Sequence, residues 1–161
     1  MGQPVKDKPA KSKHSEPEFA VARFYNSIFG HTRNWPRAYH CLAPSALERF
    51  GLERGLQSFA DYWDDKLSFL EEIVKSRHEE YPYTHRSCFA LDRVEEKWLG
   101  ADRAVFSVEL IENHVARDRL TIVQTKQLVR HAGRWLLTSG ELEGSFDDII
   151  HVKGPQTGRV S

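Results

Sequence analysis

The sequence predicts a single α+β domain in which helices come first and an antiparallel sheet follows. Apolar residues recur at helical spacing in the first half of the chain, and the period changes to two from about residue 81 onward. The later segments are joined by short connections, whereas parallel strands need crossovers of a dozen residues or more. With 161 residues, 40% of them hydrophobic, the chain is long enough to form one core.

Both ends of the chain are predicted to be tails. Residues 1–14 hold four lysines, two prolines and little apolar material. We therefore expect a flexible basic tail, because such a segment buries too little surface to offset its ordering entropy. Glycine and proline recur near the other end, and residues 151–161 are expected to form a C-terminal tail. The ordered domain is predicted to span residues 15–150.

The helical half opens with a capping signal. Ser15 is expected to accept a hydrogen bond from the backbone of Glu18, and Pro17 suits a first helical turn. This helix is predicted to end near Gly30, and Asn34 is predicted to cap a second, short helix.

Two more helical segments are expected before the sheet. A short one starts at Pro44 and is closed by Gly51. A long helix follows from about Leu56 to Val74, with acidic and basic residues on its wet side. Its predicted buried stripe consists of Phe59, Trp63, Leu67, Leu70 and Val74.

Four strands are predicted, over residues 87–98, 104–111, 120–130 and 134–142. Apolar and polar residues alternate most clearly in the second strand, and β-branched residues are frequent in the third. Turns that contain Gly100 and Gly133 form the first and third connections, and residues 113–118 form the second. Because three consecutive connections have hairpin length, the strands are expected to form an antiparallel meander.

Short stretches resemble the nuclear transport factor 2-like superfamily, including bacterial members of it. They are Phe24–Tyr25 in the first helix, residues 34–42 and 58–63 in later helices, and the Gly-Arg-Trp-aliphatic run within residues 131–137. The resemblance covers about residues 16–145. This superfamily shares its cone-shaped fold with ketosteroid isomerase, scytalone dehydratase and polyketide cyclases.

The resemblance implies a specific architecture. N-terminal helices would pack in the concave face of a strongly curved antiparallel sheet, giving a cystatin-like cone with a pocket open at one end. It also implies a homodimer formed through the outer face of the sheet, which would explain why several strands are not cleanly amphipathic.

Aromatic residues are the candidates to line that pocket. Apolar walls with a few hydroxyl and indole donors suit a small hydrophobic ligand. The alternative is plain core packing, the usual role of aromatic stripes on helices. The candidate ligand-binding residues are Tyr25, Tyr39, Trp63, Phe106 and Trp135.

Acid–base chemistry is the enzymatic alternative. Superfamily members with such activity use a carboxylate or a histidine on a strand, aided by a tyrosine. Here the candidate carboxylates are Glu109 and Asp92, and His114 is the less favoured alternative base. Tyr25 and Tyr39 are the available phenols, of which the hypothesis uses Tyr39. A buried carboxyl gains basicity by desolvation, and a phenol can stabilise an oxyanion. The alternative to a catalytic Glu109 is a side chain that faces solvent or a dimer partner, because glutamate is seldom fully buried without a partner.

The leading hypothesis is a non-enzymatic small-ligand-binding or assembly domain. The alternative is a small lyase or isomerase acting on a hydrophobic substrate in the cone. With 23 basic and 23 acidic residues, the chain lacks the basic excess typical of nucleic-acid binders. No apolar run approaches the ~20 residues that span a bilayer, and with no export signal visible the cytoplasm is the default expectation.

Other chemistries have no sequence support. The 8 histidines show no metal-ligand spacing, and there is no phosphate-binding glycine loop or nucleophile elbow. The sequence therefore predicts neither a metal site nor a cofactor. Cys41 and Cys88 are expected to be buried thiols, with a single disulfide as the alternative.

Overall fold

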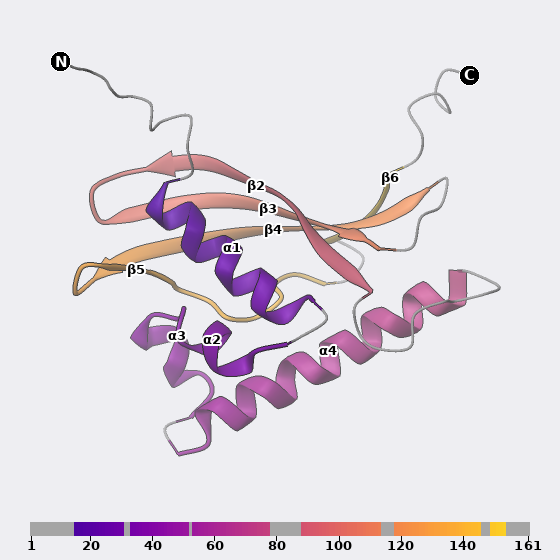
Figure 1. Cartoon of the computed structure of the whole chain (residues 1–161), viewed down its shortest axis with the longest axis horizontal. Coiled ribbons are helices and arrows are strands. Elements are labelled where there is room, and N and C mark those ends of the chain that lie inside the picture. Colours follow the sequence, from indigo (N-terminus) through magenta and orange to yellow (C-terminus); the bar gives the residue numbers. More distant parts are fainter. Residues whose placement is uncertain are drawn as a thin grey trace.

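The computed structural model describes residues 15–30, 33–51, 53–77, 88–113, 118–145 and 149–153. Within these ranges, helices come first and strands follow (Figure 1). The helices are α1 (Glu16–Ile28), α2 (Trp35–Tyr39), α3 (Pro44–Glu48) and α4 (Gly55–Arg77). The strands are β2 (Phe89–Leu99), β3 (Arg103–Glu112), β4 (Arg119–His131), β5 (Arg134–Leu137) and β6 (Ile150–Lys153). All pairings between these strands are antiparallel, which confirms the α+β class. The predicted tail of residues 1–14 lies outside the described residues.

The predicted helix starts are confirmed by their caps. The Ser15 hydroxyl accepts a hydrogen bond from the backbone N–H of Glu18 at 3.3 Å. The Asn34 side chain accepts one from the backbone N–H of Arg37 at 3.0 Å. Each cap satisfies a donor that the first helical turn leaves without an intrahelical partner.

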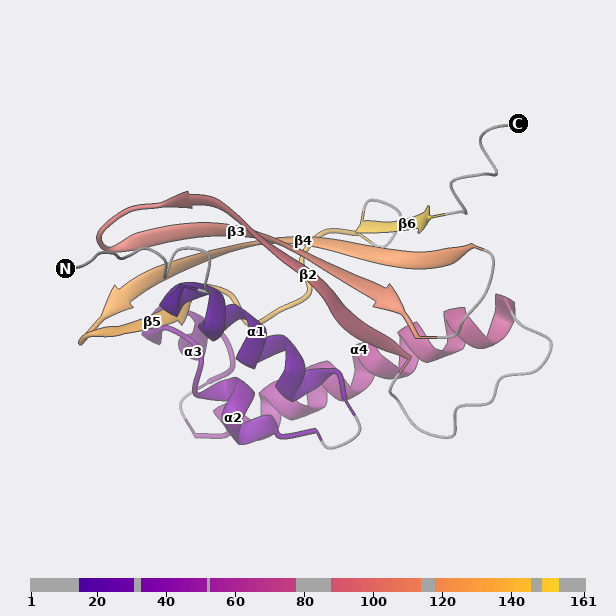
Figure 2. The same ribbon diagram turned by 45° about the horizontal axis from the view of Figure 1, so that its top comes forward.

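The sheet has the strand order β2-β3-β4-β5, and β6 also pairs with β4. Because β3 occupies one edge of β4, both β5 and β6 pair along the other edge. β5 pairs with residues 128–131 of β4, and β6 pairs with residues 119–122. Figure 2 shows the chain leaving β5 and rejoining the sheet at β6.

Two predictions about this edge differ from the structure. The strand predicted to run to Leu142 ends at Leu137, and the last bond continuing its ladder is that of the Thr138 N–H to the Gln127 carbonyl at 2.9 Å. Beyond it, side chains of other elements bind the backbone, so no strand continues. Residues 151–153, assigned from the sequence to a tail, belong to β6 instead.

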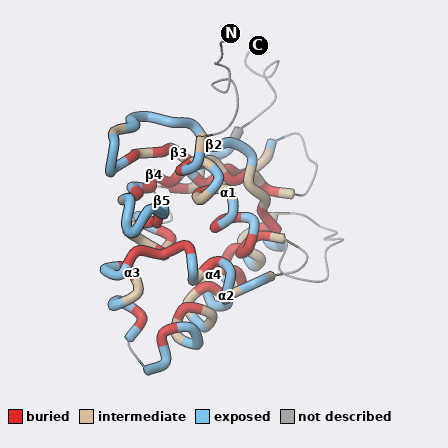
Figure 3. The backbone as a smooth tube through the Cα atoms, turned by 60° about the vertical axis from the view of Figure 1, so that its left-hand side comes forward, coloured by how far each residue is buried: buried red, intermediate tan, exposed pale blue. Residues whose placement is uncertain are grey.

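The core lies where the helices meet one face of the sheet, and Figure 2 shows α1 and α4 on that same side. Buried positions gather there along α4 and the central strands (Figure 3). The Phe24 ring stands edge-on to the Trp63 ring, with 6.3 Å between the ring centroids. The centroid of the Phe59 ring also lies 6.3 Å from that of Phe24. Such aromatic pairs contribute ~0.5–1.5 kcal/mol beyond the area that they bury. The predicted stripe of α4 is confirmed, since all five of its residues are buried.

Both cysteines are buried and free, as expected. Among the described helices, none combines the length and the apolarity needed to cross a bilayer.

Candidate functional site

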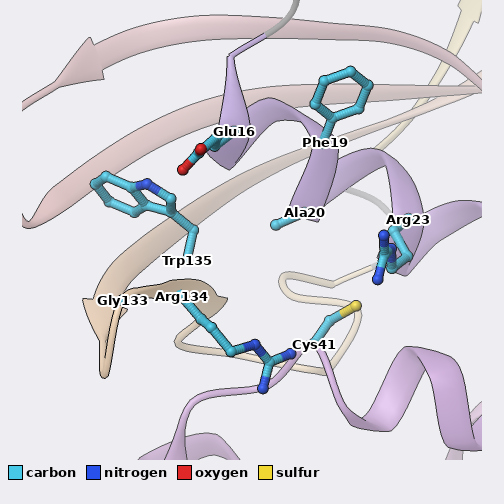
Figure 4. Close-up of a pocket in the computed structure, with 8 residues that line it drawn as sticks. All are labelled: Glu16, Phe19, Ala20, Arg23, Cys41, Gly133, Arg134 and Trp135. Atoms are coloured by element: carbon cyan, nitrogen blue, oxygen red, sulfur yellow. The ribbon is translucent and has the colours of Figure 1, made fainter.

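A groove of about 200 Å³ opens between α1, the end of α2 and the turn from β4 to β5 (Figure 4). It joins segments from opposite ends of the chain. Its lining residues are Glu16, Phe19, Ala20, Arg23, Cys41, Gly133, Arg134 and Trp135.

Local structure places these side chains together. Helical spacing puts Glu16, Ala20 and Arg23 on one side of α1, because positions three, four and seven apart share a helix face. The other wall depends on the tight turn after β4. Ala132 and Gly133 have φ values of 53° and 79°, as a two-residue type I′ turn requires. The turn at this position was predicted, and it returns the chain so that Arg134 and Trp135 reach the groove.

Two guanidinium groups occupy one end of the groove. The side chains of Arg23 and Arg134 both extend toward Cys41 (Figure 4). Arg134 donates to the His40 carbonyl at 3.2 Å. Within the described residues, neither arginine forms an ion pair with a carboxylate.

The thiol at this end is not activated. Burial raises the pKa of Cys41, and the nearby charges of Arg23, Arg134 and Arg37 only partly offset that effect. The thiol also donates to the Arg37 carbonyl at 3.3 Å. A protonated, hydrogen-bonded thiol is a poor nucleophile.

The other end of the groove differs in charge and polarity. The Glu16 carboxylate points toward the Trp135 side in Figure 4. Phe19, Ala20 and Trp135 supply the apolar part of the lining. The guanidinium of Arg130 lies 6.0 Å from the centroid of the Trp135 ring, a cation–π arrangement that fixes this wall.

Of the five predicted ligand-binding residues, Trp135 is the one that lines the groove. Trp63 and Phe106 are fully buried in the core, and Tyr39 packs against it with its ring 5.5 Å from Phe59. Tyr25 is also fully buried, and its hydroxyl has no hydrogen-bond partner among the described residues. Burial raises the pKa of Tyr25 well above its ordinary value.

The three candidate catalytic residues do not come together. Glu109 stands between the fully buried Val108 and Leu110, so its side chain points to the opposite, outer face of the sheet. It lines a hollow of about 90 Å³ there. Asp92 is exposed beside α1, and Tyr39 lies in the helical layer. His114 lies outside the described residues.

Sequence reasoning missed the buried polar residues of the sheet. Gln124 and Lys126 are almost completely buried on β4. Burial lowers the pKa of Lys126 to about 8, although the charges of Glu143 and Glu141 oppose that shift. The signal was present, since period-two alternation places both residues on the face of the buried Ile122.

A buried carboxylate was missed as well. Glu112 is fully buried at the end of β3 and accepts the Leu120 N–H at 2.9 Å. Its carboxylate lies 3.5 Å from the guanidinium of Arg77. This arrangement holds the end of β3 to β4 and α4, which is a structural role.

Neither a protein-family model nor a curated protein matches the sequence. The chemistry of the groove is therefore the basis for a functional proposal.

Proposed function

We propose that this chain is a non-enzymatic, small-ligand-binding domain of the nuclear transport factor 2-like superfamily that its sequence resembles. The proposed site is the groove between α1 and β5. The proposed ligand carries an anionic group, such as a carboxylate, on an apolar body. The observation that carries the proposal is the convergence of Arg23 and Arg134 on one end of the groove, with no described carboxylate paired to either.

The charges of this end favour an anion. Two guanidinium groups directed at one place repel each other, and a bound anion converts that repulsion into attraction. Guanidinium groups also match carboxylate geometry with two parallel hydrogen bonds. The apolar side chains of Phe19 and Trp135 then provide surface for the remainder of the ligand.

The arrangement of these residues supports ligand binding better than it supports acid–base catalysis. The Cys41 thiol has a raised pKa, and Glu109, Asp92 and Tyr39 lie apart from one another and from the groove. Of the aromatic residues expected in a cone pocket, Tyr25, Trp63 and Phe106 lie in the core and Tyr39 packs against it.

The test is isothermal titration with small aliphatic and aromatic carboxylates against the full chain. Arg23→Gln and Arg134→Gln should each weaken binding roughly tenfold or more, because a hydrogen bond to a charged group contributes ~1.5–3 kcal/mol. Arg103→Gln is the matched control, since it removes the same charge from an exposed strand position outside the groove.

Two results would contradict the proposal. One is carboxylate binding that is equally strong in both groove variants and in the control. The other is the absence of binding across the panel, together with no small molecule retained by protein from its own host in native mass spectrometry.

A second proposal concerns assembly. The outer face of the sheet exposes Trp98 by 54% and Val123 by 37%. Exposed apolar side chains on a sheet face favour association, and we propose that two copies pair through this face. Its test is given in the Discussion.

A further inference from the structure

The groove between α1 and β5 carries an acid as well as two arginines. The Glu16 carboxylate points toward the Trp135 side, whereas Arg23 and Arg134 extend toward Cys41 (Figure 4). Among the described residues, no ion pair joins Glu16, Arg23 or Arg134 to a side chain of opposite charge. The groove therefore presents a negative charge at one end and positive charge at the other.

Helix α1 holds these opposite charges apart. Glu16 and Arg23 are seven residues apart on one helix face, so their backbones are separated by about 10 Å along the helix axis. Ion pairs within a helix form between positions three or four apart, so these two side chains do not neutralise each other in that way. A charge of each sign is left for a ligand that spans this distance.

The lining between and around the two charges favours an apolar spacer. Ala20 stands between Glu16 and Arg23 on the same face of α1, four residues after one and three before the other. The aromatic side chains of Phe19 and Trp135 also line the groove. Because apolar surface is stabilised by removal from water, this lining fits methylene groups better than it fits a polar chain.

We propose that the ligand of this groove is an ω-amino acid, in which an ammonium group and a carboxylate lie at opposite ends of a methylene chain. Glu16 binds the ammonium group, and Arg23 and Arg134 bind the carboxylate. This inference rests on the proposed function, to which it adds the cationic end of the ligand and its length. A simple alkanoate leaves Glu16 unmatched. An α-amino acid carries both charges on one carbon and cannot reach both ends of the groove.

Glu16 also has a local role that any test must separate from binding. An acidic side chain in the first turn of a helix interacts favourably with the positive end of the helix dipole. Glu18 lies in the same first turn, but it lines a different hollow, together with Leu91 and Val94. Glu18→Gln is therefore the matched control for Glu16→Gln, since both remove one charge from the same helix end.

The experiment is isothermal titration of the full chain at low salt with hexanoate, ε-aminohexanoate and norleucine, the isomer whose ammonium group lies beside the carboxylate. ε-Aminohexanoate should bind about two- to fivefold more tightly than hexanoate, the range expected for one exposed ion pair, and norleucine should not. Glu16→Gln should remove this preference, and Glu18→Gln should retain it. Arg134→Gln should weaken hexanoate and ε-aminohexanoate by the same factor.

The outcomes separate this inference from the function on which it rests. Equal affinities of hexanoate and ε-aminohexanoate for the unaltered chain, both lowered by Arg134→Gln, would overturn the inference and leave the proposed function standing. Loss of the preference in Glu18→Gln as well as in Glu16→Gln would overturn it too, because the effect would then belong to the helix end. Binding of none of the three ligands would remove the inference, and the wider carboxylate panel then decides the proposed function. The comparison of ligands in the unaltered chain holds even if Glu16→Gln does not fold.

Discussion

The side-chain amide of Gln124 closes a two-bond ring with the backbone of Glu143, at 2.8 Å through its oxygen and 2.9 Å through its nitrogen. The ring lies past the point where β5 ends, and it replaces the ladder that the strand would have continued. Gln124 is 2% exposed, whereas Glu143 is an exposed residue, so the ring connects the buried strand β4 to the surface of the domain.

Gln124→Leu should lower the free energy of unfolding by about 1–3 kcal/mol, because it removes two hydrogen bonds that each contribute a net ~0.5–1.5 kcal/mol. Urea denaturation followed by tryptophan fluorescence measures the change. Gln127→Leu makes the same substitution at an exposed position of the same strand and should stay within ~0.5 kcal/mol of the unaltered chain. Equal losses in the two variants would show that the ring contributes nothing.

Lys126 should make stability rise with pH above about 8. Burial lowers its pKa from 10.5 to about 8 in the folded chain, so between these values the unfolded state binds the extra proton. Stability increases with pH wherever the unfolded state binds more protons, by at most ~1.4 kcal/mol per pH unit for one group.

Comparison with Lys126→Met isolates this effect. Tyr62 and Cys88, whose pKa values burial raises to about 12, act in the opposite direction, but they do so in both proteins. The difference in unfolding free energy between the unaltered chain and Lys126→Met should shift by about 1–2 kcal/mol between pH 8 and pH 9.5, in favour of the unaltered chain. A difference that stays constant over this range would contradict the prediction.

The outer sheet face should support a dimer. Sedimentation of the full chain should give two copies at micromolar concentration, and Trp98→Lys with Val123→Lys should give one, because the two substitutions replace exposed apolar side chains of this face by like charges. Phe69→Lys is the control, since Phe69 is also exposed, by 47%, but lies on α4. A chain that sediments as a monomer at every concentration tested would remove the dimer proposal.

Ala132 should be a site of strain. It adopts φ 53°, which alanine tolerates less well than asparagine, and a β-branched residue tolerates it worst. Ala132→Asn should raise the free energy of unfolding by ~0.5–1 kcal/mol and with it the melting temperature. Ala132→Val should lower both. Equal melting temperatures in the two variants would mean that the turn is free to change conformation.

The predictable parts of the fold are those decided by neighbours in the sequence. Ser15 and Asn34 cap helices because the N–H that each accepts lies three residues away. The stripe of α4 and the alternation in β3 likewise follow from local period. The end of β5 was not predictable in this way, because it depends on Tyr62, a residue 80 positions away from Leu142.

The residues of the candidate site likewise divide into those that the local sequence indicates and those that only the fold brings together. Trp135 was one of the aromatic residues predicted to line a pocket, and it lines the groove. Arg23 was missed, since nothing near it in the sequence indicates that the β4–β5 turn will bring Arg134 beside the same thiol. Tyr25, Trp63 and Phe106 were assigned to a pocket because aromatic composition does not reveal whether side chains enclose a space or fill it.

Among the described strands, β2 stands at one edge of the sheet, and its character has a consequence for how copies of this chain associate. Its pairing with β3 has two register shifts, and Arg93, Glu95 and Lys97 form a charged row along it. Irregular, charged edges resist the addition of further strands, which is how natural sheets avoid edge-to-edge aggregation. Addition of further strands at β2 is therefore disfavoured, so the proposed association of copies would use a face of the sheet and not this edge.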